Sequence, residues 1–350
     1  MDGLVSPLLV LVLTNVLFGA VASALLLRWV DRSTLGRAAT VLLGLGLAPF
    51  VVTWILYVLL AVLPGISSEV VIAVVVGLFA YLAWVVGTGW RALGEFISLV
   101  PARLRDPSLW FYLFFLGAMI FGSFIMLTYK PLVDHDILEY GTQGRIFLRD
   151  MAVHYEKHHF DAVTGFYYVG LHGFSFPLLF TWEGMVRGLL GDGGDAWVRF
   201  LTPYYALLLV SFVWATLRRF DVWVAVWASG AFALTIGFLY LNTIYHVDPM
   251  RLFLFTASFA LFLNVVRAPS LPVIGCWGFV LGAHAMVHSL GMILAPFMLA
   301  GAWLFMPGTF GKRTVSLVLA TAVFMVAGGI HYVLDILIGT GWLFKEITWF

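Results

Sequence analysis

Long hydrophobic runs dominate the chain, and short polar segments separate them. A helix that crosses the ~30 Å hydrocarbon core of a bilayer needs about 20 apolar residues. The first run follows no positively charged segment, so it is predicted to be a span and not a cleaved signal peptide. We predict an all-α fold, a polytopic transmembrane helical bundle of about ten spans. The predicted spans are residues 5–29, 40–63, 69–90, 109–128, 197–217, 222–241, 252–266, 272–290, 291–306 and 314–338.

One polar interruption is much longer than the others. Residues 129–196 hold 14 of the 37 charged side chains (19 basic plus 18 acidic). The segment is too polar to span a membrane and too long for a simple connector. The chain therefore divides into N-terminal transmembrane helices at 1–128, a large loop at 129–196 and C-terminal transmembrane helices at 197–350.

The composition agrees with a membrane protein. Hydrophobic residues make up 62% of the chain, charged residues 11%, and the mean hydropathy is +1.02. Soluble domains carry about 25% charged residues. A water-soluble enzyme, a nucleic-acid-binding protein and a disordered chain are thus excluded, and membrane lipids are expected partners. The single cysteine, Cys276, allows neither an internal disulfide nor a cysteine-based metal site.

The basic residues predict the orientation, because cytoplasmic loops are enriched in Lys and Arg. With the N-terminus outside, one side receives eleven basic and only four acidic residues, and that side is predicted to be cytoplasmic. The loop at 129–196 is then extracytoplasmic, in a multi-pass protein of the cell (inner) membrane. The eleven are Arg28, Arg32, Arg37, Arg91, Arg103, Arg105, Arg218, Arg219, Arg267, Lys312 and Arg313.

All nine histidines fall on the predicted outer side or in the outer half of a span. Three short outer segments are polar as well: YHVDPMR (245–251), HAMVHS (284–289), and His331 with Asp335. Ionisable residues at membrane depth are costly and usually functional. Together with the large loop, these segments predict one polar cavity at the outer membrane surface.

The large loop opens with a segment of helical spacing. In LVDHDILEYGTQGRIFLRDM, Asp136, Tyr140 and Gln143 share one face of a helix. We predict a short juxtamembrane helix that starts at Asp134 to Asp136. Asp136 and Glu139 also match a capping box, in which the aspartate only satisfies free N–H groups at the helix start.

The same residues resemble a motif of integral-membrane glycosyltransferases. Asp136, Tyr140 and Arg145 are similar to the D-x-x-x-Y-x-x-x-x-R pattern of the GT-C superfamily, in the group of protein O-mannosyltransferases and aminoarabinose transferases. FSFPLLFTWEG (174–184) resembles the family's P-P-L-x-y-W-like stretch. The resemblance covers about residues 130–185 and implies transfer of a sugar from a polyprenyl-phosphate donor to an acceptor hydroxyl at the outer face.

The resemblance also implies roles for particular residues. Asp136 matches the catalytic base, and Asp134, two residues away, is the other candidate for that role. Asp248 is a second acidic group, and its alternative role is to start a helix together with Pro249. No cofactor is expected, with a divalent metal as the open alternative. The acceptor is a lipid, a glycan or a protein, and another subunit could complete its site. The candidate substrate-binding residues are Glu139, Tyr140, Arg145, His172, His246, Arg251, His288 and His331.

Two other classes of function remain open. His154 and His158, like His284 and His288, are spaced one helical turn apart, which suits a shared metal and resembles the histidine boxes of membrane di-iron oxidases and hydroxylases. Asp335 within a span, four residues after His331, is also compatible with the proton relay of a transporter.

Overall fold

The computed structural model describes residues 2–30, 35–98, 105–129, 135–153, 159–161, 166–168, 173–189, 196–235, 237 and 246–337. Only the backbone is described at residues 2–6, 124–129, 135–139, 159–161, 166–168, 196 and 237. Asp134 and His172, both predicted site residues, lie outside the described residues.

The described part of the chain is predominantly helical, as the hydrophobic pattern predicts. Helices occur in all ten segments predicted as spans. The elements in chain order are α1 Asp2–Leu11, η1 Val12–Leu17, α2 Phe18–Trp29, α3 Arg37–Val62, α4 Ser68–Val85, α5 Gly89–Ser98, α7 Pro107–Tyr129, α8 His135–Asp150, β1 His159–Asp161, β2 Phe166–Tyr168, α9 Ser175–Gly188, α10 Ala196–Leu217, α11 Val222–Leu234, α13 Asp248–Arg267, α14 Leu271–Val287, α15 Leu290–Phe305, α16 Phe310–Phe324, η2 Met325–Gly329 and α17 Ile330–Leu337.

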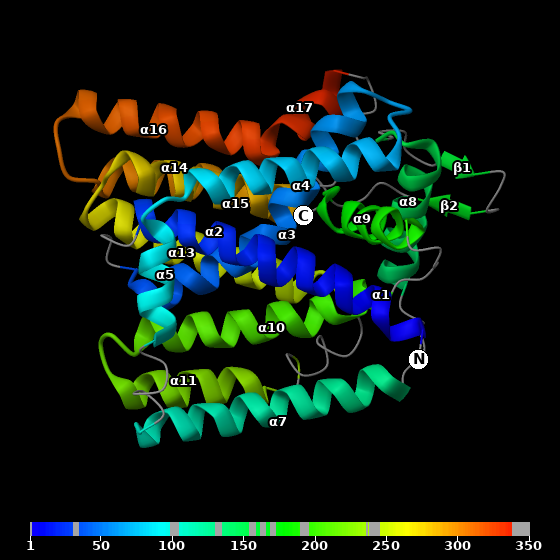
Figure 1. Ribbon diagram of the computed structural model, residues 1–350. Helices are drawn as coiled ribbons and strands as arrows, with labels where there is room; N and C mark the ends of the chain where they lie inside the picture. Colours follow the sequence, from blue (N-terminus) through cyan, green and yellow to red (C-terminus); the bar gives the residue numbers. More distant parts are fainter. Residues whose placement is uncertain are drawn as a thin grey trace.

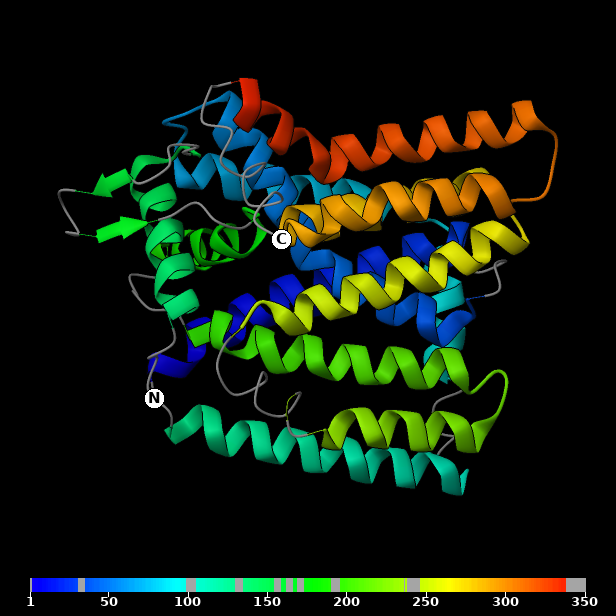
Figure 2. The same cartoon turned by 180° about the vertical axis from the view of Figure 1, so that it is seen from behind.

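The long helices run along one common direction, and the polar elements gather at one end of the bundle. Figure 1 shows α8, α9, β1 and β2 together at that end, with the N-terminus nearby. The connections from α10 to α11 and from α15 to α16 lie at the opposite end, and Figure 2 shows the same division from behind. The bundle thus has two distinct ends, one of which carries the loop predicted to hold the active site.

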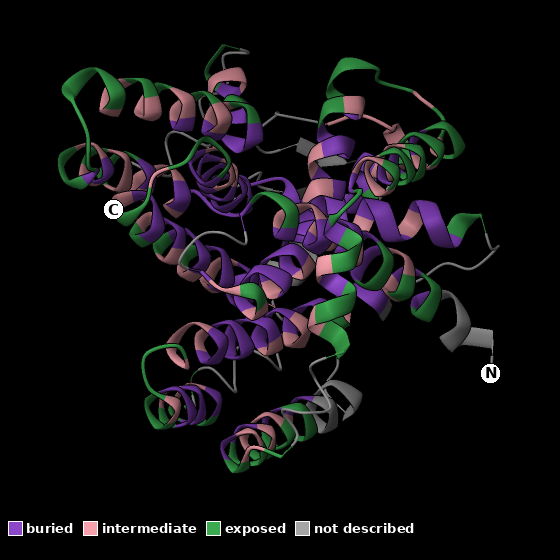
Figure 3. Cartoon of the chain, turned by 60° about the vertical axis from the view of Figure 1, so that its left-hand side comes forward, coloured by how far each residue is buried: buried purple, intermediate pink, exposed green. Residues whose placement is uncertain are grey.

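The outer surface of the bundle is apolar, as expected for helices in lipid. Within the described part of the chain, six helical segments are long and apolar enough to cross a membrane, and four more apolar helices, at 107–123, 222–234, 271–287 and 290–305, are shorter. Large side chains such as Trp84, Phe114 and Phe297 are 79%, 69% and 72% exposed. Figure 3 shows the buried residues in the interior, while exposed ones cover the outer helix faces and the turns. A chain with this surface suits a membrane and not water.

Three local features depart from the predicted pattern. The loop contains a two-stranded antiparallel sheet in which His159 pairs with Tyr168, so the fold is not strictly all-α. A short helix, α5, follows the third predicted span. Two π-helical segments, η1 and η2, interrupt the first and last long helices. The sheet forms where aromatic residues flank a Thr-Gly turn signal, a composition that favours strands over helix.

The π-helical segment η1 fastens the first helix to α9 and α10. Trp182 Nε1 donates a hydrogen bond to Thr14 Oγ1 at 2.8 Å. Trp197 Nε1 donates to Asn15 Oδ1 at 2.9 Å. These buried polar pairs satisfy groups that would otherwise be costly inside an apolar bundle. The contacts fix α9 relative to the membrane helices.

Helix α14 packs against α16 and η2 at very short range. A Cβ atom at Gly282 would lie 2.6 Å from the Phe324 carbonyl oxygen and 2.6 Å from Ala327 Cβ. At Gly278 it would lie 2.6 Å from the Ala320 carbonyl oxygen. Glycines spaced four residues apart allow this approach of helix backbones in membranes. This contact brings two histidines close to the same interface. His284 lies at the end of α14, and His331 lies just after η2.

We expect Gly282→Leu to destabilise the bundle strongly. Overfilling a packed interface typically costs about 1–3 kcal/mol, and here the nearest atom is a backbone oxygen that cannot move alone. Gly275→Ala on the same helix is the control, because a Cβ there meets nothing within 4 Å. Thermal unfolding in detergent should show a clearly lowered midpoint for Gly282→Leu only. Equal midpoints for the two variants would contradict the close packing.

Candidate active site

Helix α8 begins at His135, where the sequence predicts the juxtamembrane helix, and packs along α9. A Cβ at Gly144 would lie 2.4 Å from the Pro177 carbonyl oxygen, so only glycine allows this approach. Thr181 Oγ1 donates a hydrogen bond to the Gly144 carbonyl oxygen at 2.9 Å. The first turn of α8, which contains Asp136 and Glu139, is thereby held by a fixed pair of helices. The side chains of Asp136 and Glu139 lie outside the described residues.

Tyr140 and Arg145, the other two residues of the resemblance, have opposite environments. Tyr140 is buried, and its ring packs edge-on against Phe176 with a centroid distance of 5.2 Å. Arg145 is exposed. Tyr140 therefore takes part in the α8–α9 packing, whereas Arg145 presents its charge on the surface of α8.

The start of α13 carries a compact charged group. Asp248 is buried, His246 Nδ1 lies 2.8 Å from Asp248 Oδ2, and Arg251 Nη2 contacts Asp248 Oδ1. Pro249 occupies the first turn of α13, which confirms the helix-start interpretation of this segment. Asp248 consequently fixes the orientation of two neighbouring side chains, and its carboxylate is already engaged by them.

The turn from α14 to α15 brings two more histidines to this group. Arg251 interacts electrostatically with His284, and His288 does so with Asp248. His284 is buried, and its Nε2 has no hydrogen-bond partner among the described residues. The start of α13 and the end of α14 therefore form one polar cluster, which consists of His246, Asp248, Arg251, His284 and His288.

The structure corrects the prediction that His284 and His288 align on one helix. Helix α14 ends at Val287, and His288 has an extended backbone with φ −157° and ψ 144°. His288 Nδ1 instead accepts a hydrogen bond from the backbone N–H of Leu290 at 3.1 Å. In the neutral ring, this bond assigns the proton to Nε2. The side chain helps to cap α15, and the one-turn spacing that would suit a metal is lost.

His331 lies in an aromatic setting next to the polar end of the bundle. It is fully buried, with ring contacts to Tyr57 at 6.2 Å, Phe174 at 5.7 Å and Tyr332 at 4.1 Å. The backbone of Gly328 interacts with the ring, although neither ring nitrogen meets full hydrogen-bond geometry with a described residue. Its neighbour one turn along, Asp335, is also buried. His331 is therefore packed among aromatic rings, beside the polar cluster.

Short contacts connect the loop to the polar cluster. A Cβ at Gly173, just before α9, would lie 1.8 Å from the Met286 carbonyl oxygen near the end of α14. Phe174 packs on His331 and also on Phe147 of α8, at 5.7 Å each. The structure thus brings α8, α9 and the ends of α13, α14 and α17 to the same end of the bundle, as the sequence predicts.

Glu183 of α9 is a buried charged residue that the sequence reasoning missed. Its carboxylate accepts hydrogen bonds from the backbone N–H groups of Trp197 at 2.7 Å and Val198 at 3.1 Å, and from Arg187 at 3.2 Å. Burial raises the pKa of Glu183 to about 7, and these three donors oppose the rise. The side chain caps the start of α10 across the loop, so its role is to hold α9 in place. In the sequence, only the i, i+4 spacing of Glu183 and Arg187 indicates that this carboxylate is paired.

Among the residues that the structure describes, no three or more His, Cys, Asp or Glu side chains are arranged so that they could hold one metal ion, and the polar cluster is no exception. His154 and His158, the other candidate pair, lie outside the described residues.

The fold and the surface define the chain as a helical protein with several helices able to cross a membrane. Comparison of the chain with family models, curated proteins and solved structures gave no match.

Proposed function

We propose that the protein is a membrane glycosyltransferase of the GT-C type, which moves a sugar from a polyprenyl phosphate to an acceptor hydroxyl at the outer face. The observation that carries the proposal is the polar cluster of His246, Asp248, Arg251, His284 and His288 at the end of the bundle where α8 begins. An acid at the start of α8 and cations at the same end of the bundle suit the two charges that the reaction must handle.

The proposed reaction is an inverting displacement. Asp136 takes the proton of the acceptor hydroxyl as that oxygen forms a bond to the anomeric carbon. The bond between this carbon and the phosphate oxygen breaks, and polyprenyl phosphate leaves with the electron pair. Arg251 is suited to stabilise the departing phosphate, because charge-assisted hydrogen bonds from arginine match phosphate oxygens.

Asp248 is less suited than Asp136 to act as the base. Its two carboxylate oxygens already engage His246 and Arg251, so both positions that could accept a proton from the acceptor are occupied. We assign Asp248 the positioning of Arg251. His246 and His288 then surround the phosphate site as donors, while Glu139 and Arg145 lie on α8, where the acceptor would approach.

The decisive experiment uses purified protein in lipid nanodiscs with radiolabelled polyprenyl-phosphate sugars and a membrane extract as the source of acceptor. Label should move to an acceptor while free polyprenyl phosphate appears in equal amount. Elemental analysis of the same sample should show no stoichiometric transition metal. Bound iron together with no transfer from any of the sugar donors would contradict the proposal and favour the oxidase alternative.

The sidedness of the site can be tested separately. In a Cys276→Ala background, cysteines introduced at Lys157 and at Arg103 should react from opposite faces of the membrane with an impermeant reagent. The excess of basic residues predicts Arg103 on the cytoplasmic side and Lys157 outside. Labelling of the Arg103→Cys variant in intact cells would overturn the orientation and with it the proposed reaction at the outer face.

A further inference from the structure

A cavity of about 250 Å³ lies between α10 and α13, far from the polar cluster. Helix α13 starts in the cluster at Asp248, ends at Arg267 and is 20 residues long. At a rise of 1.5 Å per residue this separation is about 30 Å, or one membrane thickness. The cavity therefore opens near the basic end of the bundle, and it is distinct from the proposed active site.

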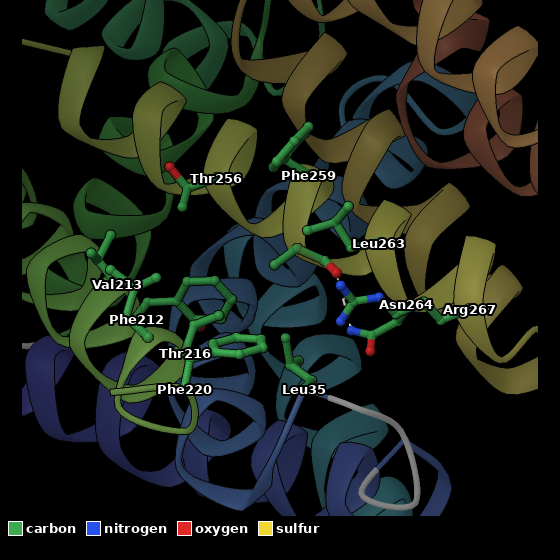
Figure 4. A pocket seen from close by; sticks show the side chains of 12 residues that line it. Leu35, Phe212, Val213, Thr216, Phe220, Thr256, Phe259, Leu263, Asn264 and Arg267 are labelled. Atoms are coloured by element: carbon green, nitrogen blue, oxygen red, sulfur yellow. Dashed lines mark hydrogen bonds between the residues drawn. The ribbon is translucent and has the colours of Figure 1, made fainter. Parts of the chain in front are cut away.

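The walls of the cavity are mostly apolar. Figure 4 shows Phe212, Thr216 and Phe220 on one side, with Phe259 and Leu263 of α13 facing them. Both α10 and α13 are long and apolar enough to cross a membrane. A cavity between two such helices, lined by aromatic and aliphatic side chains, suits a hydrocarbon chain.

Two buried polar atoms in this apolar lining lack partners. Asn264 is 3% exposed, and its Nδ2 donates to the Ala260 carbonyl oxygen at 3.0 Å. Its Oδ1 and the Thr216 Oγ1 have no hydrogen-bond partner among the described residues. Each of these two atoms is itself covered by protein, so a ligand in the cavity meets the apolar lining and not these acceptors.

Arg267 adds a positive charge at the mouth of the cavity. It is exposed, lies in the last turn of α13, and follows Asn264 by three residues on the same helix face. A guanidinium group binds phosphate through two parallel hydrogen bonds. The lining thus presents a cation at the helix end and an apolar channel inward of it.

We propose that this cavity binds one anionic membrane phospholipid. Arg267 contacts the lipid phosphate, and one acyl chain fills the apolar part between α10 and α13. A free phosphate ion would leave the apolar lining empty, and a zwitterionic lipid would place an ammonium group beside Arg267.

Native mass spectrometry of the purified full chain tests the proposal, with phosphatidylglycerol and phosphatidylcholine of identical acyl chains as probes. The unaltered protein should bind one phosphatidylglycerol with a Kd about tenfold or more below that for phosphatidylcholine. Arg267→Gln should abolish this preference. Arg91→Gln is the matched control, since Arg91 is an exposed arginine of α5 that does not line the cavity.

A filling variant separates the cavity from the surface charge. Ala260→Phe places a ring inside the lining and should reduce binding of both lipids, while a normal unfolding midpoint verifies the fold. Equal affinity of the unaltered protein for the two lipids would overturn the proposal. So would equal effects of Arg267→Gln and Arg91→Gln, which would indicate only a diffuse positive surface. These measurements need no sugar donor, so they are independent of the transferase assay.

Discussion

Replacing Asp136 by asparagine is expected to reduce sugar transfer by about 10²–10⁴-fold, the usual contribution of a positioned general base. Asparagine keeps the size of the side chain and most of its ability to cap a helix, but it cannot accept the acceptor's proton at neutral pH. Helix α8 begins at His135, so Asp136 lies in the first turn of a helix that α9 holds in place. The variant should therefore fold and bind the lipid-linked donor normally.

The competing explanation for Asp136 predicts a different pattern. A residue that only caps α8 would change the free energy of unfolding by a few tenths to ~1 kcal/mol on substitution and leave turnover nearly intact. Asp134→Asn is the control for the loss of one negative charge in the same segment, and its effect should be milder. A folded Asp136→Asn variant with near-normal turnover would show that the aspartate is a cap and not a catalyst.

Much of the fold follows from hydropathy because each long apolar run has only one low-energy choice in lipid, a helix that satisfies its own backbone. Where local sequence does not determine the outcome, the prediction weakens. The segment at 222–241 is continuously apolar, yet α11 ends at Leu234. The breaks at η1 and η2 depend on partners far along the chain, such as Trp54, which donates to the Val326 carbonyl oxygen at 2.8 Å.

The candidate site shows the same division between local and long-range information. The pairing of Asp248 with Arg251 is local, because both residues lie in one helical turn. The proximity of Arg251 to His284 required two different helices to pack, and no local signal encodes it. His288 misled the helical-spacing argument because α14 ends one residue before it. Glu183 caps α10 from 14 residues away, beyond any capping motif.

Arg251 is the second residue at which we expect a large effect. Arg251→Gln should lower turnover by about 10²–10³-fold, the typical cost of removing one donor that stabilises developing negative charge. Arg251→Lys should restore only part of the rate, because lysine keeps the charge but loses the planar pair of donors. The loss should appear mainly in kcat, since the phosphate gains its charge as the bond to the sugar breaks.

A structural role for Arg251 makes a different prediction, and a double variant distinguishes the two. Arg251→Gln leaves Asp248 with the histidines His246 and His288, so the single variant could lose activity because a buried carboxylate has lost its arginine partner. In Asp248→Asn/Arg251→Gln both charges are absent, and the unfolding midpoint should return toward that of the unaltered protein. If Arg251 only neutralises Asp248, transfer should recover together with stability. If Arg251 stabilises the leaving phosphate, the double variant should be stable and as slow as the single one, because the cation that the departing phosphate requires is still missing.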